Sequence, residues 1–325
     1  MPGLVERLDD LQRRRRVVGF PLAVVYKFFD DQGNYLAAII TYYAFIAIFP
    51  LLLIASSVLG FLLQGDGDLE RELLSSALGQ FPIVGTQLGQ PEGLQGSTSA
   101  VVVGALAALY GVTGLGQAAQ NALNVAWAIP RNSRLNPLHS RLMSLLLLMV
   151  GGLSVLAVAI LPSLAGQIGA FGSNMVLKWV VTVASLALTA LVLSVMMSLT
   201  TAERHRLRTV LPGGIAIAVM WHVLQLLGGV YVGRVVNRAS EMNGVFALVL
   251  GLVALIYIAS VMAMLGIELN VVRAKELYPR ALLTPFTDDV RLTEADRRVY
   301  TEYAEAQRHK GFEQVTVTFE RDPGG

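Results

Sequence analysis

The sequence contains no cysteine and few charged residues, and both absences narrow what the protein can be. Without cysteine, a disulfide framework, a thiol nucleophile and a cysteine-based metal site are all excluded. Charged residues make up 15% of the 325 residues, whereas soluble proteins carry about 25%. Hydrophobic residues make up 54%, and the net charge is only +2. This composition indicates a membrane protein and argues against a polyelectrolyte that binds nucleic acid.

Long uncharged runs predict helices that cross a membrane. A spanning helix needs roughly 20 apolar residues at about 1.5 Å each. The runs do not alternate as the strands of a membrane barrel would. The predicted fold class is therefore an all-α integral membrane protein with interfacial amphipathic helices. The six predicted transmembrane helices cover 36–63, the uncharged stretch from near 99 to 130, 142–161, 176–200, 210–232 and 245–267.

The distribution of Lys and Arg predicts how the chain is oriented. The segments on one predicted side carry 21 of the 25 Lys and Arg residues, and the loops on the other side carry four. Basic residues favour the cytoplasmic side, so both termini are expected in the cytoplasm, as an even number of spans requires. The predicted parts are a basic, interfacial N-terminal segment (1–30), a six-helix transmembrane domain (31–272) and a cytoplasmic C-terminal tail (273–325).

Shorter patterns predict structure outside the membrane. The segments 20–29 and 69–81 are apolar on one side and too short to span, so both are expected as interfacial helices. In the tail, Thr293 followed by Asp296 is typical of a helix N-terminus. The alternation of VTVTF at 315–319 predicts a short strand.

Pro50 lies in the middle of the first apolar run. The 28 residues of 36–63 would measure about 42 Å as one straight helix, whereas the hydrocarbon core is about 30 Å thick. Pro50 cannot donate to the carbonyl of Ile46 and should bend the helix there. A bend that only serves packing and a bend that lines a cavity or acts as a hinge both remain open.

Several short motifs occur in order along the chain: Tyr35 to Ala38, Thr41 to Ala44, Phe49-Pro50, Asn121, Asn124, Trp127, Leu211 to Gly214, Trp221, Asn243-Gly244 and Gly266 to Asn270. These motifs resemble those of the YihY/BrkB membrane proteins, a family once labelled ribonuclease BN. The resemblance covers roughly 15–275 and implies a bacterial inner-membrane protein with six helices. It implies no established catalytic activity and no agreed binding residues, although transporter-like and lipid-handling roles have been suggested for members. Ile267 departs from the alanine usual in the closing motif.

The second apolar run carries a stripe of amide side chains. Their spacing of i, i+3, i+4 and i+7 puts them on one helical face, and amides within a membrane need partners. Hydrogen bonding between helices and the lining of a substrate pathway are both open, as is a helix broken at Gly111, Gly114 or Gly116. The predicted pathway residues are Gln117, Gln120, Asn121 and Asn124, with Tyr42 and Tyr43 from the first helix.

Two further groups of charged residues are candidates for function. Glu268 is the one acid inside a predicted transmembrane helix, so a proton-coupled role would use it. The alternative is a structural role, in which water or Arg273 is the partner of the Glu268 carboxylate. The run Arg13, Arg14, Arg15 and Arg16 could contact anionic lipid head groups. No catalytic residue, no metal site and no cofactor are predicted, because the four histidines lack metal-ligand spacing and nucleotide-binding motifs are absent.

The leading functional hypothesis is a transporter-like protein without its own ATPase that moves a lipid or another amphiphile. Its expected partners are membrane lipids and the amphiphilic substrate, with no nucleic acid, and the sequence leaves the oligomeric state open. The alternative is a non-transporting scaffold that recruits partners through the cytoplasmic tail. The ribonuclease of the old family label is disfavoured, because no carboxylate cluster suited to two metal ions occurs in a loop.

Overall fold

A computed structural model describes residues 9, 11–62, 98–167, 175–235, 241–284, 286–287 and 290–320. Helices account for its regular structure, and the described part contains no strand. The interfacial helix expected at 69–81 lies outside these residues. The elements are α2 (Arg16–Asp30), α3 (Gly33–Leu62), α6 (Thr98–Ala126), η2 (Arg131–Ser133), α7 (Pro137–Gln167), α8 (Met175–Thr200), α9 (Leu207–Val235), α10 (Glu241–Ala274) and α11 (Glu294–Glu305).

Four helical stretches are long and apolar enough to cross a bilayer by length and composition, among the residues whose side chains are described. They are Pro137–Val155, Met175–Thr200, Leu207–Leu227 and Val249–Ala274. A further apolar stretch, Gly33–Ile48, is shorter. The protein is thus a helical membrane protein, and the count of six spans stays a prediction that α3 and α6 would complete.

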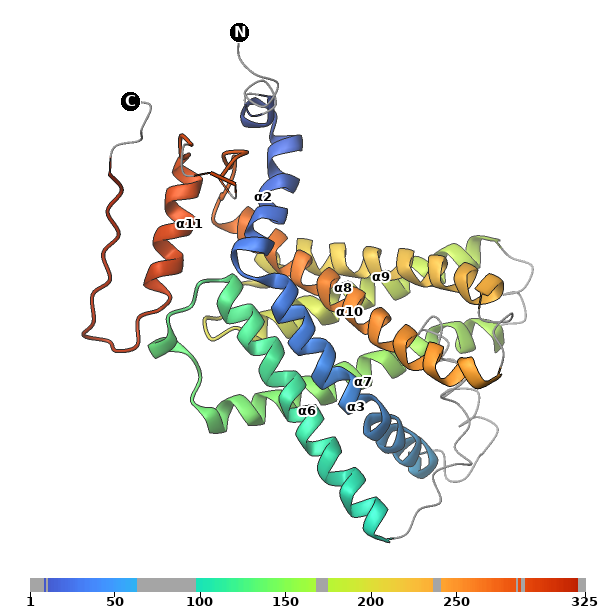
Figure 1. Ribbon diagram of the computed structural model, residues 1–325. Coiled ribbons are helices and arrows are strands. Elements are labelled where there is room, and N and C mark those ends of the chain that lie inside the picture. The colour runs from blue at the N-terminus through green and yellow to red at the C-terminus, as the bar shows by residue number, and fades with distance from the viewer. Residues whose placement is uncertain are drawn as a thin grey trace.

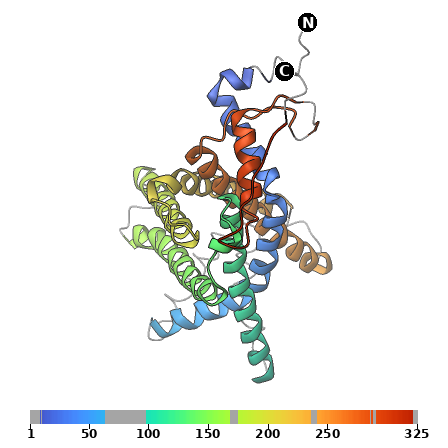
Figure 2. The same ribbon diagram turned by 90° about the vertical axis from the view of Figure 1, so that its left-hand side faces the viewer.

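The long helices pack side by side, while two shorter ones gather at one end (Figure 1). α8, α9 and α10 run together, and α3 and α6 cross beside them. α2 and α11 lie at the end where α10 finishes and point across the long helices (Figures 1 and 2). Lys275, just after α10, donates to the backbone oxygen of Trp127 at 2.9 Å, so the loop after α6 lies at this end too. Several basic segments predicted to share the cytoplasmic side are therefore neighbours.

Glycines let α9 approach both of its neighbours closely. A Cβ on Gly213 would collide with the backbone oxygen of Gly266 on α10. A Cβ on Gly214 would collide with Ser194 on α8. Pro212 is tolerated here because it lies near the start of α9. The Leu-Pro-Gly-Gly sequence thus produces a tight three-helix contact.

The glycines of α6 have the same role, so the alternative of a broken second helix is wrong. α6 is continuous from Thr98 to Ala126. Gly111 and Gly114 face the backbone of Ala47 and the ring of Tyr43 on α3, and Gly116 faces Ser144 on α7. A glycine costs a helix only about 1 kcal/mol relative to alanine, which close packing can offset.

The first apolar run forms a single helix, α3, through Pro50. Its ribbon changes direction partway along in both views (Figures 1 and 2). The side chain of Pro50 lies outside the described residues, so the purpose of the bend stays open.

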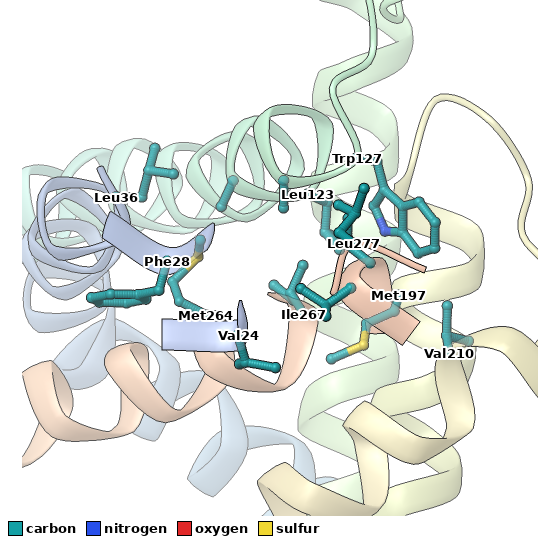
Figure 3. Packing of buried hydrophobic residues seen from close by; sticks show 14 of the residues in the cluster. Val24, Phe28, Leu36, Leu123, Trp127, Met197, Val210, Met264, Ile267 and Leu277 are labelled. Carbon is teal, nitrogen blue, oxygen red and sulfur yellow. The ribbon is translucent and has the colours of Figure 1, made fainter. Parts of the chain in front are cut away.

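The main hydrophobic core lies where the helices meet α2. α2 contributes Val24 and Phe28, which pack toward Met264 and Ile267 of α10 (Figure 3). Leu277 of the tail joins the same cluster. Burial of this side of α2 holds a helix too short to span against the end of the bundle.

The tail helix begins where the sequence predicts. Thr293 and Asp296 form a reciprocal capping box at the start of α11. The predicted strand at 315–319 is wrong, because no partner strand lies beside it in the described chain. Instead the guanidinium of Arg297 lies over the ring of Phe319 at 5.7 Å, which packs this extended segment against α11.

Candidate functional site

A buried ion pair joins α2 to the bundle. Lys27 lies on the buried side of α2, and its side chain is only 3% exposed. Its ammonium contacts the carboxylate of Asp31, four residues later, and donates to the backbone oxygen of Ala126 at 3.2 Å. Lys27 lies among the apolar residues on the buried side of α2, so packing of this side against the bundle also buries the ammonium group.

Glu268 of α10 meets the same cluster. Its side chain has no exposed surface, and Oε2 lies 3.8 Å from Lys27 Nζ. Among the described residues, neither carboxyl oxygen has a hydrogen-bond donor. Arg273, the cation expected from the sequence, is exposed, and the described cation beside Glu268 is Lys27 instead.

A second buried cation, Arg280, holds the tail against α2. Its Nε donates to Asp296 of α11, and a terminal nitrogen donates to Asp30 at 2.9 Å. Asp296 also accepts from Ala281 N at 3.0 Å and from Thr293 N at 2.9 Å. Asp296, the N3 residue of the α11 capping box, is thereby the acceptor that fixes Arg280.

Both cations stay charged although they are buried. Burial by itself lowers the pKa of Lys27, but the carboxylates of Glu268 and Asp31 outweigh this effect and raise it. Burial likewise opposes the charge on Arg280, and Asp30 and Asp296 raise its pKa. The end of the bundle therefore holds two cations facing four carboxyl groups.

A groove opens between α3 and α10 on the exposed face of the bundle. Its volume is about 320 Å³, and its walls are almost entirely apolar. Tyr42 and Tyr257 are 54% and 37% exposed at its edge. At its base Thr41 Oγ1 donates to Ser260 Oγ at 3.3 Å. The lining residues are Ala38, Thr41, Tyr42, Phe45, Val253 and Tyr257.

The two tyrosines predicted for the pathway lie together. Tyr42 contacts the ring of Tyr43 edge-on at 5.1 Å, and Tyr43 contacts Tyr110 of α6 at 5.7 Å. Tyr42 lines the groove, while Tyr43 lies between α3 and α6.

The amide stripe divides into two pairs with different environments. Gln120 is buried, donates to Ser144 Oγ at 2.9 Å and accepts from Ser140 Oγ at 2.8 Å. Asn124 is buried and accepts from the backbone N–H of Ala202 at 3.1 Å. These two amides join α6 to α7 and to the segment after α8.

The other two amides, Gln117 and Asn121, are exposed. Asn121 accepts from Arg134 at 3.0 Å. A ligand can meet this exposed pair without breaking the contacts that Gln120 and Asn124 make with other segments.

The arginine run also divides. Arg13 pairs with Asp9 at 2.7 Å and donates to the backbone oxygen of Arg291 at 3.1 Å. Arg14, Arg15 and Arg16 are exposed, so these three are accessible to lipid head groups.

The residues that sequence reasoning missed are Lys27, Asp31, Arg280 and Asn270. The signal for the first two is local, because Lys27 and Asp31 have the i, i+4 spacing of an ion pair on an apolar helix. Asn270 accepts from Gly213 N at 2.7 Å and donates to Val210 O at 2.9 Å. The closing Glu-hydrophobic-Asn motif thus serves two neighbours, since Glu268 faces α2 and Asn270 faces α9.

The fold and these clusters define a class, the multi-helix membrane proteins with charged groups buried at one end of the bundle. The described residues contain no group of three or more His, Cys, Asp or Glu side chains placed to hold a metal ion. The family model described as Virulence factor BrkB matches residues 24–287. The chain therefore belongs to the BrkB family, as its motifs indicate. Comparisons with curated proteins and with solved structures found no match.

Proposed function

We propose that this BrkB-family protein is a transporter-like inner-membrane protein that moves a lipid or another amphiphile without its own ATPase. The observation that carries the proposal is the groove between α3 and α10. It lies on the exposed surface of helices that are expected to face lipid, and it combines apolar walls with two partly exposed tyrosines, Tyr42 and Tyr257.

The size of the groove limits what it can bind. Pockets for small molecules measure about 300–1,000 Å³, so a groove of about 320 Å³ suits one part of an amphiphile. An apolar chain would lie against Ala38 and Phe45, and a polar group would reach the tyrosine hydroxyls. Burial of apolar surface contributes about 25 cal/mol per Å² only where that surface leaves water, so in lipid the preference must come from shape and the hydroxyl groups.

The groove and Glu268 share one face of α10. Val253, Tyr257, Ser260 and Glu268 are spaced 4, 3 and 8 residues apart, and in a helix these positions fall within one stripe. The rise from Tyr257 to Glu268 is about 16 Å. A shift of α10 would therefore act on both places at once.

The test is lipid translocation in proteoliposomes, with the groove filled in one variant. Ala38→Trp places a large ring in the groove, and Ile39→Trp places the same ring on the neighbouring exposed position. We expect at least tenfold slower translocation in Ala38→Trp and a wild-type rate in Ile39→Trp, where tenfold corresponds to about 1.4 kcal/mol. Equal rates in both variants would remove the groove from the path.

The amide stripe is tested with its exposed pair only. Gln117→Ala combined with Asn121→Ala leaves the buried contacts of Gln120 and Asn124 intact, so the fold is retained. Loss of translocation in this variant assigns the exposed pair to the substrate path. A wild-type rate makes the stripe structural.

The proposal includes six spans with both termini in the cytoplasm. Because the chain contains no cysteine, single cysteines can be introduced without a background signal. Glu305→Cys in the tail should react with a membrane-impermeant maleimide only after the cells are opened. Glu92→Cys, in a predicted outer loop, should react in intact cells. The reverse pattern would invert the topology.

A further inference from the structure

The carboxyl group of Glu268 has the least compensation of the four in the buried charge cluster. Asp296 accepts from Arg280, Ala281 N and Thr293 N. Asp30 pairs with Arg280 and remains 24% exposed to solvent. Asp31 contacts Lys27 directly. Glu268 is fully buried, and its nearest described cation lies 3.8 Å away.

Among the described residues, Lys27 is the one cation within 4 Å of Glu268, and Arg273 on α10 itself is exposed. α3 and α6 contain no Asp, Glu, Lys, Arg or His. On α9 the basic residue nearest in sequence to the contact with α10 is Arg208, which is exposed. α2 and the residue after it supply Lys27, Asp30 and Asp31. One ammonium therefore faces the two deeply buried carboxyl groups of Asp31 and Glu268.

A buried cluster with an unbalanced negative charge is costly. The carboxyl groups of Asp31 and Glu268 both approach the ammonium of Lys27, Asp31 in direct contact and Glu268 Oε2 at 3.8 Å. Two ionised carboxylates supply acceptors only, whereas one proton turns either of them into a donor. A single proton would give Glu268 its missing hydrogen bond and bring the trio of Lys27, Asp31 and Glu268 to zero net charge.

We propose that Glu268 and Asp31 form a proton-binding site, in which one proton shared between the two carboxyl groups balances the Lys27 ammonium. The proton comes from water and returns to water, and no other bond changes. Asp31 follows Asp30, which is 24% exposed, so the end of the bundle where α2 and the tail meet is the side from which we expect the proton to exchange with solvent.

The site joins α2 to α10 in a proton-dependent way. With the proton bound, the two helices share a neutral hydrogen-bonded trio. Without it, one uncompensated negative charge lies between them, and water or a displacement of α2 must relieve it. The inference does not rest on the proposed transport, because it concerns charge balance in the protein alone.

The test is an infrared titration of the full-length protein in lipid nanodiscs between about pH 5 and pH 9, a range in which buried carboxyl groups titrate. The observable is the C=O stretching band of a protonated carboxylic acid, identified by its shift in D₂O. We expect wild-type protein to show this band and Glu268→Gln to lose it. Glu305→Gln, an exposed control on α11, should retain it.

Two neighbours should move the titration midpoint in opposite directions. Asp31→Asn leaves Glu268 balanced by Lys27, so proton affinity should fall at least about tenfold. Lys27→Met removes the cation, so proton affinity should rise at least about tenfold. If Lys27→Met does not fold, Asp31→Asn alone still decides, since a merely structural role predicts no such shift.

Three results would overturn the proposal. The first is the absence of the band in wild-type protein throughout the titration. The second is a band that persists in Glu268→Gln. The third is loss of the band on adding NaCl but not choline chloride at constant pH, which would make the site a sodium site. Because no substrate is present, failure here leaves the translocation test unaffected, and failure of translocation leaves this test unaffected.

Discussion

Replacing Arg280 with methionine tests how the tail is held. Arg280 is 1% exposed and bonds to Asp296 and Asp30. Methionine keeps the apolar stem of the side chain as far as the position of Nε but leaves both carboxylates without their cation. Removing one partner of a buried ion pair costs about 3–5 kcal/mol.

The expected loss lies near the lower end of this range, at about 3 kcal/mol, for two structural reasons. Asp30 is 24% exposed and can be hydrated. Asp296 keeps the backbone N–H groups of Ala281 and Thr293 as donors. A loss of about 3 kcal/mol raises the population of undocked tail by roughly two orders of magnitude.

Hydrogen exchange measured by mass spectrometry reports this undocking directly. Amides of Glu294–Glu305 should exchange roughly 100-fold faster in Arg280→Met, while those of α8 and α9 stay unchanged. The matched control is Arg298→Met, which removes an exposed donor to Lys275 O and should change exchange less than about fivefold. Equal exchange in wild type and Arg280→Met would refute the view that this ion pair holds the tail.

Three further substitutions test the packing contacts and the pH response. Gly213→Ala should lower the thermal unfolding temperature in detergent, since overpacking costs about 1–3 kcal/mol, whereas Gly152→Ala, with no described atom within 4 Å of the new Cβ, should not lower it. Asn124→Ala should cost about 1 kcal/mol, since it removes the acceptor of the partly buried Ala202 N–H, and Asn121→Ala should change the melting temperature little. Burial lowers the pKa of His205, so the unfolded chain binds a proton at this residue more readily than the folded protein does. Stability should therefore fall as the pH drops below about 6.5. The variant His205→Gln should flatten this pH dependence. The close packing of Gly213 would be contradicted by an unchanged melting temperature in Gly213→Ala. The role of Asn124 would be contradicted by equal effects of the two asparagine changes. The burial of His205 would be contradicted by an unchanged pH profile in His205→Gln.

The infrared and exchange experiments together separate two roles of α2. Lys27 meets the bundle through Glu268, and Asp30, three residues later, meets the tail through Arg280. Loss of the tail contact in Arg280→Met with an unchanged carboxyl band would show that the two contacts act independently. A shift of both would show that α2 links the tail to α10.

The sequence by itself determined the class of the protein, because bilayer thickness and the cost of buried charge leave uncharged runs of about 20 residues few alternatives. It also predicted α11 from Thr293 and Asp296, since a capping box is a local interaction. The family followed from the motifs, and the match over 24–287 confirms it.

Only the tertiary structure decided which polar residues face one another. Gln120 and Gln117 lie on the same face of α6 by spacing, yet one bonds to α7 and the other is exposed. The glycines of α6 were open to interpretation as a break, and their close neighbours on α3 and α7 explain them as contacts. Glu268 meets Lys27 across 241 residues of chain. Helical periodicity states which residues share a face, whereas the partner of that face depends on how distant helices pack.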